Sequence, residues 1–336
     1  MPITIQELAR QLNLSKGTVS RVLNNREDAF ISEATRLRVQ EAARELGYRP
    51  NRAARALATG RSHSIAFCTH KVTALSALVL NRVQGLVQQH DLELIITTFD
   101  RQSATQAEQT ISSPWHVDGV LTYESSDYIH LIFDDPTGIR PPTVNMGTYL
   151  IEDTDFVGTD LCPAIVDSVR HLYAVGCRRI AYMEEEEAAG RATPDFRHLS
   201  YHGTMEEAGA RPEYIVTADG ARASARKAIQ EYVQANGHPD GILCRNDDLA
   251  IGTYRGLRDL GLRIPEDVAL VGCDGIEDTE YLDPPLSTIV QPLEAMCDLA
   301  WEFLERRMGD SSRPLQRAIL PSRLVIRGSS QRDLTP

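Results

Sequence analysis

The sequence predicts a small all-α head followed by a larger α/β body that is built from two doubly wound parallel-sheet lobes. Apolar residues recur at helical spacing through residues 5–58. From Ser64 onwards, short β-type runs alternate with helical patterns, which is typical of βαβ units and parallel sheets. Eight such runs are present, more than a single sheet of about five or six strands holds. We therefore expect two lobes with a cleft between them.

Charge is distributed unevenly along the 336 residues, whose net charge is −12. Residues 1–62 carry eleven Arg/Lys and six Asp/Glu, a net charge of +5, whereas the rest of the chain carries −17. A basic head on an acidic body predicts an anionic partner for the head. The charge of the body disfavours non-specific binding to the same polyanion.

The cysteines and the hydropathy pattern predict the cellular compartment. The six cysteines are widely spaced and form no C-x-x-C pair, so we expect buried, reduced thiols. The sequence has no signal peptide and no apolar stretch of about 18 residues. We therefore expect a soluble cytoplasmic protein.

The first two helices of the head carry clear capping signals. Residues 5–12 form the first, with Thr4 as its N-cap. Asn13 suits the left-handed conformation that the turn after such a helix often needs. Ser15 caps the second helix, which extends towards Asn25.

A third and a fourth helix follow in the head. Ser32 caps the third helix and Gly47 ends it. Residues 51–59 are predicted to form a short fourth helix, which ends at Gly60.

The first two helices and their turn are typical of a helix-turn-helix, whose second helix lies in the major groove of DNA. Lys16 and Arg21 are the side chains best able to reach guanine O6 and N7. Gly17 leaves a bare position on the outward face, which lets the backbone approach a base pair closely. The alternative is an ordinary three-helix bundle with a basic surface. Together with hydroxyl and amide groups that suit phosphate oxygens, the candidate DNA-contacting residues of the head are Thr4, Ser15, Lys16, Gly17, Thr18, Ser20, Arg21 and Asn24.

The β-type runs supply the candidate strands of the body. The acidic run at residues 184–187 follows one of them and is expected to be a solvated loop. The candidate strands are residues 64–69, 92–99, 118–123, 142–147, 179–183, 213–218, 240–245 and 268–274.

Polar residues at two strand ends are candidate ligand contacts, because ligands of parallel α/β sheets bind at the carboxyl ends of strands. Asn246 and Asp247 follow the run 240–245, and Asp274 ends the run 268–274. Their amide and carboxylate groups can exchange hydrogen bonds with the hydroxyl groups of a sugar.

Long stretches of the chain resemble the lactose/galactose repressor (LacI/GalR) family of transcriptional regulators. The stretches "LSKGTVSRVLNN" and "ISEATRLRVQEAARELGYRPNRAARALATGRSHSIAF" are similar to the head of that family. The stretches "GTDLCPAIVDSVRHLYAVGCRRIAYM" and "RNDDLAIGTYRGLRDLGLRIPEDVALVGCDG" follow in the family's order. The resemblance implies a sequence-specific DNA-binding regulator with a body of the periplasmic-binding-protein type.

The resemblance also implies a hinge helix in "YRPNRAARALATG" that folds on operator DNA. Isolated helices below about 12 residues are marginal in water, so such a helix needs a partner. In a dimer, two hinge helices would insert Leu57 into the minor groove, because an apolar wedge unstacks a base step and kinks the duplex. Asn51 and Arg52 would approach the phosphate backbone.

In the body, the resemblance implies that Arg197 binds the effector together with the strand-end residues. Three positions depart from the family pattern. Ser200 stands where glycine is usual, Cys177 where histidine is usual, and Gly147 where many members carry a polar ligand contact. A nucleobase or another metabolite is therefore the alternative to a carbohydrate effector.

The expected domain order follows from these elements. A helix-turn-helix domain occupies residues 1–49, a hinge helix and linker 50–62, and a two-lobed effector-binding and dimerisation domain 63–330. Crossing connections between the lobes are implied near residues 160 and 290. The N-terminal lobe then comprises residues 63–160 and 291–319, and the C-terminal lobe 161–290 and 320–328.

We expect a homodimeric repressor that binds a pseudo-palindromic operator and responds to a small effector, a carbohydrate or a derivative. The tail "RGSSQRDLTP" has no leucine heptads, which predicts a dimer rather than a tetramer. A sensor whose head contacts protein, and a metal-dependent enzyme on the same body, are the remaining alternatives.

Enzymatic activity is not expected, because no nucleotide-binding loop, hydrolase elbow or zinc-protease motif occurs. His198, His202 and Glu206 share one helical stripe but lack the general-base carboxylate of a zinc protease. No cofactor and no metal site are therefore predicted.

Overall fold

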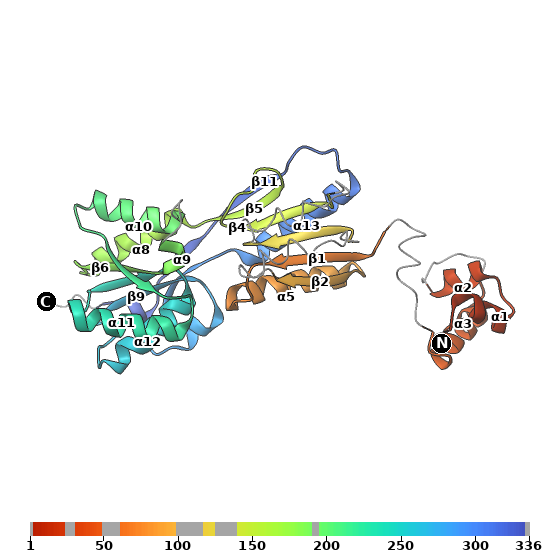
Figure 1. Ribbon diagram of the computed structural model, residues 1–336, viewed down its shortest axis with the longest axis horizontal. Coiled ribbons are helices and arrows are strands. Elements are labelled where there is room, and N and C mark those ends of the chain that lie inside the picture. Colours follow the sequence, from red (N-terminus) through yellow and green to blue (C-terminus); the bar gives the residue numbers. More distant parts are fainter. Residues whose placement is uncertain are drawn as a thin grey trace. The chain divides into compact units, whose positions relative to one another are not determined.

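The computed structural model describes residues 3–23, 31–48, 61–98, 117–124, 140–189 and 195–332. The chain divides into two units, Met1–His63 and Ser64–Pro336, here called the head and the body. Figure 1 shows the elements of both units. Over these described ranges, none of the helices is long and apolar enough to span a membrane.

The head begins with α1 (Ile5–Leu12) and α2 (Lys16–Leu23), joined by a tight turn. Thr4 caps α1 within a capping box, and Asn13 ends it in the left-handed conformation at φ 55° and ψ 43°, as predicted. The backbone N–H of Thr18 donates to the Ser15 hydroxyl at 3.0 Å, which caps α2. These contacts confirm the helix-turn-helix.

The third helix of the head, α3 (Glu33–Glu45), has Ser32 as its N-cap. Gly47 follows its end with a φ of +62°, a conformation that favours glycine. The predicted fourth helix, residues 51–59, lies outside the described residues. The three described helices share one apolar core, made of Leu8, Ala9, Val19, Val22, Val39 and Ala43.

The N-terminal lobe of the body contains a six-stranded parallel sheet in the order β11-β5-β4-β3-β1-β2. Helices α5 (Ala74–Gln89) and α13 (Leu293–Gly309) pack their apolar side chains against it. The strands are β1 (Ser64–Thr69), β2 (Glu93–Thr98), β3 (Gly119–Tyr123), β4 (Thr143–Gly147), β5 (Asp155–Asp160) and β11 (Arg317–Pro321).

The C-terminal lobe contains a second six-stranded sheet in the order β12-β10-β9-β8-β6-β7, parallel except for its edge strand β12. Its strands are β6 (Ile180–Glu185), β7 (Glu213–Thr217), β8 (Gly241–Cys244), β9 (Ala269–Asp274), β10 (Ser287–Val290) and β12 (Arg323–Val325). Its helical elements are α8 (Cys162–Ala174), α9 (Glu186–Ala189), α10 (Phe196–Glu207), α11 (Arg222–Asn236), α12 (Asp247–Asp259), η2 (Glu277–Tyr281) and η3 (Gly328–Ser330).

The second sheet is covered by helices on both faces, as Figure 1 shows for α8 and α10 on one side and α11 and α12 on the other. Successive residues of β6 accordingly enter different cores. Tyr182 packs with the α8 and α10 side chains, whereas Ala181 and Met183 pack with those of α11 and α12. This alternation is what a doubly wound sheet requires, and it confirms the predicted fold class.

The described chain passes between the two sheets three times. It crosses after β5, again after β10, and finally at Ser322, which alone separates β11 from β12. Because β11 joins the first sheet and β12 the second, each lobe is completed by a strand from near the end of the chain.

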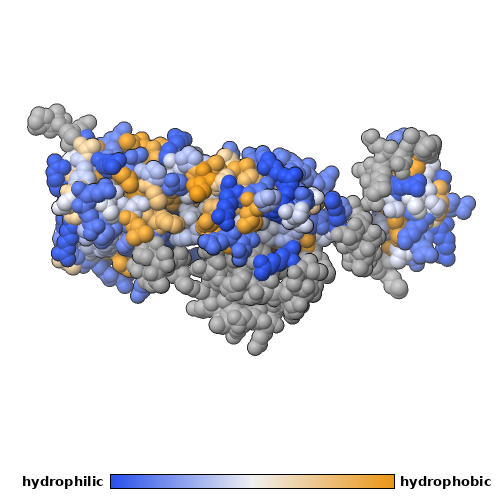
Figure 2. Space-filling model, turned by 90° about the horizontal axis from the view of Figure 1, so that it is seen from above, coloured by the Kyte–Doolittle hydropathy of each residue, from blue (hydrophilic) through white to orange (hydrophobic). Residues whose placement is uncertain are grey.

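The surface of the body mixes charged and apolar side chains, which Figure 2 shows as interspersed blue and orange regions. Phe196, Tyr281 and Ile319 are among the large apolar side chains that are more than half exposed. All six cysteines are free thiols, and five of them are buried.

Candidate functional site

The outward face of α2 is polar, and its inner face is part of the head's core. Lys16, Gly17 and Arg21 are exposed, whereas Val19 and Val22 are buried. A Cβ added at Gly17 would lie 3.6 Å from the Ser15 hydroxyl, an ordinary contact, so the position has room for a side chain. The glycine is therefore not required by packing within the head.

The hydroxyl groups near the start of the two helices are used in local hydrogen bonds. The Thr4 hydroxyl accepts from the Glu7 N–H at 3.2 Å, and the Ser15 and Thr18 hydroxyls lie 2.8 Å apart. Ser20 is half-buried on α2. The remaining candidate DNA-contacting residues, which lie outside the described residues, are Asn24, Asn51, Arg52 and Leu57.

A cavity of about 300 Å³ lies between the lobes of the body. Strand ends of both sheets contribute to its wall, as expected for parallel α/β sheets. Three predicted residues, Arg197, Asn246 and Asp274, line it. Its other charged, polar and aromatic lining residues include Thr69, His70, Lys71, Thr73, Ser76, Tyr123, Glu124, Tyr149, Glu185, Asp219, Asp248, Arg245 and Gln291.

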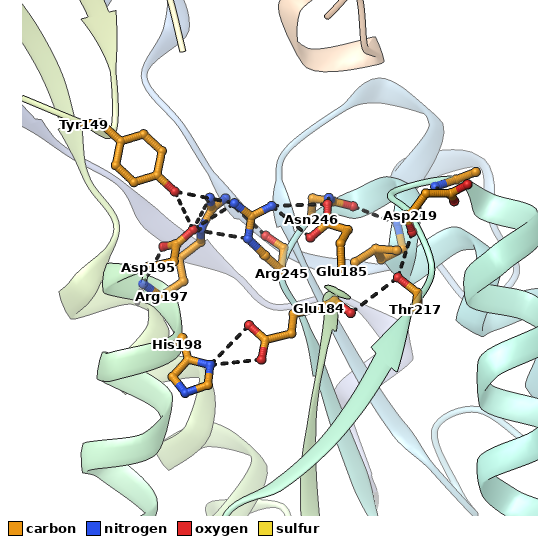
Figure 3. A network of polar contacts seen from close by, with 12 residues as sticks. Tyr149, Glu184, Glu185, Asp195, Arg197, His198, Thr217, Asp219, Arg245 and Asn246 are labelled. Atoms are coloured by element: carbon orange, nitrogen blue, oxygen red, sulfur yellow. Dashed lines mark hydrogen bonds and ion pairs between the residues drawn. The ribbon is translucent and has the colours of Figure 1, made fainter. Parts of the chain in front are cut away.

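Asp195 joins the two cavity arginines into one ionic network (Figure 3). It is 2% exposed and caps α10. Arg197 Nη2 donates to Asp195 Oδ2 at 2.6 Å, and Arg245 Nη2 donates to the same oxygen at 2.9 Å. Burial opposes ionisation of Asp195, but the charges of the two arginines outweigh it and hold its pKa well below the usual range.

The network also joins the two lobes. Tyr149, which follows β4 in the N-terminal lobe, donates its hydroxyl to Asp195 Oδ2 at 2.7 Å. Arg245 Nη1 donates to Glu185 Oε2 at 2.9 Å. The Asn246 amide nitrogen donates to Glu185 Oε1 at 3.1 Å, while its oxygen accepts from the Leu249 N–H at 2.8 Å and so caps α12. A ligand in the cavity would therefore contact groups that already connect both lobes.

Asp274 and Gln291 form a buried pair in the cavity wall. Gln291 Nε2 donates to Asp274 Oδ1 at 2.9 Å, and Gln291 Oε1 has no hydrogen-bond partner among the described residues. The φ of Asp274 is +142°, a conformation that non-glycine residues rarely adopt. Burial and the negative charge of Asp247 raise the pKa of Asp274 well above its usual range.

Asp247 does not line the cavity, which differs from its expected place beside Asn246. Its carboxylate is fully buried and accepts from the Gly275 N–H at 2.7 Å, the Ile276 N–H at 3.0 Å and the Thr288 hydroxyl at 2.6 Å. Burial raises the pKa of Asp247 to about 6, against these hydrogen bonds. The physical reason is that this first residue of α12 turns back towards the sheet, where it holds the turn after β9.

Glu124 occupies the space that Gly147 leaves open. A Cβ at Gly147 would lie 2.7 Å from Glu124 Oε1. That oxygen accepts from the Thr148 N–H at 2.8 Å and from the Thr148 hydroxyl at 3.0 Å. The carboxylate of Glu124, which follows β3, therefore lies where a polar side chain at position 147 of β4 would otherwise lie.

The stripe of His198 and His202 faces aromatic and acidic neighbours. His198 Nδ1 lies 2.9 Å from Glu184 Oε1, and its ring stacks on Tyr214 at a centroid distance of 4.8 Å. His202 Nε2 lies 3.3 Å from Glu206 Oε1. Burial raises the pKa of Glu184, partly offset by His198. Within the described ranges no group of three His, Cys, Asp or Glu residues is placed to hold a metal ion.

The acidic run after the fifth predicted strand is not the solvated loop that the sequence suggested. Glu184 and Glu185 belong to β6, and both are bound in the networks described above. Sequence reasoning therefore missed Glu185, as it missed Glu124, Tyr149, Asp195 and Arg245. The rule that polar residues at strand ends bind ligands applies to Glu124 and Glu185 too and could have found them.

Comparisons with known proteins agree with this architecture. Residues 4–51 match "Bacterial regulatory proteins, lacI family", and residues 169–330 match "Periplasmic binding protein-like domain". The ribose operon repressor of Escherichia coli strain K12 is 30% identical, over 97% of this chain and 99% of its own length. The HTH-type transcriptional repressor CytR of the same strain is 28% identical, over 98% and 96%.

A solved structure is also similar. The lac repressor dimer bound to operator and the anti-inducer ONPF matches with a TM-score of 0.81 and 22% identity, over 98% of this chain and 99% of that one. The two repressors above support a regulator rather than an enzyme. From the 30% identity over nearly the full length, and from the match of the head, the chain belongs to the LacI family of bacterial regulatory proteins.

Proposed function

We propose that this chain is a repressor that binds a pseudo-palindromic operator as a homodimer and is controlled by a small effector between the lobes of its body. One observation carries the proposal: the same chain contains a helix-turn-helix and a two-lobed body. The outward face of α2 is exposed and polar, and the body has a polar cavity between its lobes. Each head of the dimer reads one half-site, which explains the symmetry of the operator.

Base recognition is assigned to Lys16 and Arg21, because both are exposed on α2. Residues 50–62 are proposed to act as the hinge, with Leu57 as the minor-groove wedge. The phosphate contacts are assigned to Thr4, Ser15, Thr18, Ser20, Asn24, Asn51 and Arg52.

The effector is assigned to the carbohydrates and their derivatives, with Arg197, Asn246 and Asp274 among its contacts. Support comes from the amide, carboxylate and guanidinium groups of the cavity wall, which suit hydroxyl groups, and from the ribose operon repressor among the relatives. The second candidate is a nucleobase or a similar metabolite. It is favoured by Tyr123 and Tyr149 in the wall, because aromatic side chains pack against planar rings.

Effector and operator affinities are reciprocally coupled in this proposal. A ligand that contacts both lobes changes how they pack at the dimer interface and hence the spacing of the hinge helices. By thermodynamic linkage, the operator changes the affinity for the effector by the same factor.

Operator binding can be tested with a fluorescent duplex from the region upstream of the chain's own gene, compared with a shuffled duplex of equal length. We expect a clear preference for the natural duplex. Its affinity should fall by roughly 10³-fold or more between about 50 and 200 mM salt, as for proteins that neutralise six to ten phosphates. Sedimentation of the free protein should give a dimer. Equal binding of the two duplexes, a flat salt response or a stable tetramer would contradict the proposal.

Gly17→Gln should change the preferred operator sequence more than it changes stability. The position has room for a side chain, and a glutamine there can contact a base edge. Replacing the helical glycine should also stabilise the head slightly, by at most about 1 kcal/mol. Selection of bound duplexes from a randomised pool measures the preference. An unchanged consensus sequence would show that Gly17 has no part in operator choice.

A further inference from the structure

Among the described residues, the carboxylates that line or adjoin the interlobe cavity have cationic partners except for two. Arg197 and Arg245 are matched by Asp195 and Glu185, which take up the donor groups of both guanidinium groups. Arg197 Nη1 donates to the Arg245 carbonyl oxygen at 3.4 Å. Neither arginine therefore presents an unmatched charge to a ligand.

The two outer carboxylates of the wall, Asp248 and Asp219, also have partners. Asp248 accepts from Arg222 Nε at 2.7 Å. Hydrogen bonds from Ser224 and the Ala221 N–H, together with the positive charge of Lys71, lower the pKa of Asp219. What remains is Glu124 and Asp274, neither of which has an ion-pair partner in the part of the chain that the structure describes.

Glu124 lines the cavity and has a neutral hydrogen-bond partner. Its partner is Thr148, a neutral residue, and it lies in the space left by Gly147. Arg197 is close enough to oppose the effect of burial in part, but burial dominates and raises the pKa of Glu124. Glu124 is half-buried, and a bound cation would favour the charged form of its carboxylate.

Asp274, the second carboxylate without an ion-pair partner among the described residues, lies beside another hydrogen-bond acceptor, Gln291 Oε1. Asp274 is 9% exposed, and Gln291 is 6% exposed with an oxygen that finds no donor among the described residues. Both line the cavity. A buried acceptor is expensive to leave without a hydrogen bond, and a hydroxyl group of a molecule in the cavity can donate one to Gln291 Oε1.

We propose that the effector is a small hydroxylated amine, such as an amino sugar, whose protonated nitrogen binds between Glu124 and Asp274. Its hydroxyl groups donate to Gln291 Oε1 and Glu185. The inference rests on the proposed function in placing the effector in this cavity. It excludes phosphorylated and acidic sugars, because Arg197 and Arg245 are already paired with Asp195 and Glu185, and an anion gains no ion pair from Glu124 or Asp274.

The test uses the full chain, with matched probes that differ in one group. D-glucosamine, D-glucose and D-glucose 6-phosphate form one set, and D-galactosamine, D-galactose and D-galactose 6-phosphate a second. Ligand binding is measured as a shift in melting temperature at millimolar concentration and by isothermal titration calorimetry. At least one amine should bind more tightly than its neutral partner, and its phosphate ester should not bind.

Two substitutions locate the amine. Glu124→Gln and Asp274→Asn keep the carbonyl acceptors for Thr148 and Gln291, but the new side chains cannot ionise when the amine binds. Each should weaken amine binding by roughly 10- to 100-fold, because hydrogen bonds to charged groups contribute about 1.5–3 kcal/mol. Glu207→Gln, on an exposed residue of α10, is the matched control and should leave the affinity unchanged. The second variant keeps the test valid if the first does not fold.

The proposal is overturned if no amine of the panel binds, if a neutral or phosphorylated partner binds as tightly, or if neither charge-neutralising variant weakens amine binding. Operator binding is measured separately with the ligand-free protein. Amine binding without operator binding would refute the proposed function and leave this inference standing. Operator binding without amine binding would refute this inference and leave the proposed function standing.

Discussion

Asp195→Asn should destabilise the body by about 3–5 kcal/mol, because it leaves the buried Arg197 without its counter-ion and removes one of the two carboxylates that pair with Arg245. Asp195 is 2% exposed and bonds to Arg197, Arg245 and Tyr149. Asparagine has nearly the same shape as aspartate, so the loss of stability measures the effect of the charge rather than of packing. The urea midpoint of the full chain, followed by tryptophan fluorescence, measures the effect. Because the pKa of Asp195 is lowered, its contribution is present at neutral pH and disappears as the pH falls below the usual aspartate range.

Asp298→Asn is the matched control for this substitution. It breaks the ion pair between Arg82 and Asp298, whose side chains are 37% and 44% exposed. Exposed pairs of this kind contribute about 0–1 kcal/mol. If Asp195→Asn shifted the urea midpoint no more than Asp298→Asn, Asp195 would not be the centre of the network.

Lys16→Ala should cause a large loss of operator affinity without unfolding the head. The side chain is exposed on α2 and takes no part in the apolar core of the head. A lost base contact costs about 1–3 kcal/mol, and a symmetric dimer loses it twice. The affinity should therefore fall roughly 30-fold to 10⁴-fold. Titration of a labelled operator at fixed salt measures the loss, and circular dichroism verifies the fold.

Lys227→Ala is the matched control, because Lys227 is 76% exposed on α11 in the body. It should leave operator affinity unchanged. The two possible roles of Lys16 can be separated by comparing operator variants. Relaxed specificity at one base pair indicates direct readout, whereas an equal loss for every sequence with a reduced salt dependence would assign Lys16 to a phosphate instead.

The elements that could be predicted from the sequence carry their own local signals. The helices of the head begin and end at capping residues whose contacts reach only a few positions along the chain. These residues are Thr4, Asn13, Ser15 and Ser32. Four of the described strands were not predicted, namely β5 (Asp155–Asp160) and three that lack such signals. β10 and β12 have four and three residues, and β11 alternates between exposed and half-buried positions. They become strands because a distant segment supplies the hydrogen-bonding partner, which no local pattern reveals.

The candidate site divides in the same way. Asn246 and Asp274 follow strands and were found from that position alone, and Arg197 from the family resemblance. Asp195 was missed because its role depends on Arg245, fifty positions away in the chain. Asp247 shows the converse, since the strand-end rule selects it although its carboxylate is used to hold the turn at Gly275 and Ile276.

The single residue between β11 and β12 has a consequence for synthesis on the ribosome. The edge strands β11 and β12, which complete the two sheets, begin at Arg317 and Arg323. Neither lobe can therefore be complete until nearly the whole chain has been synthesised. The head, whose described core ends at Tyr48, has no such dependence and can fold as soon as it emerges. During translation, the folded head therefore precedes the body, which we propose senses the effector.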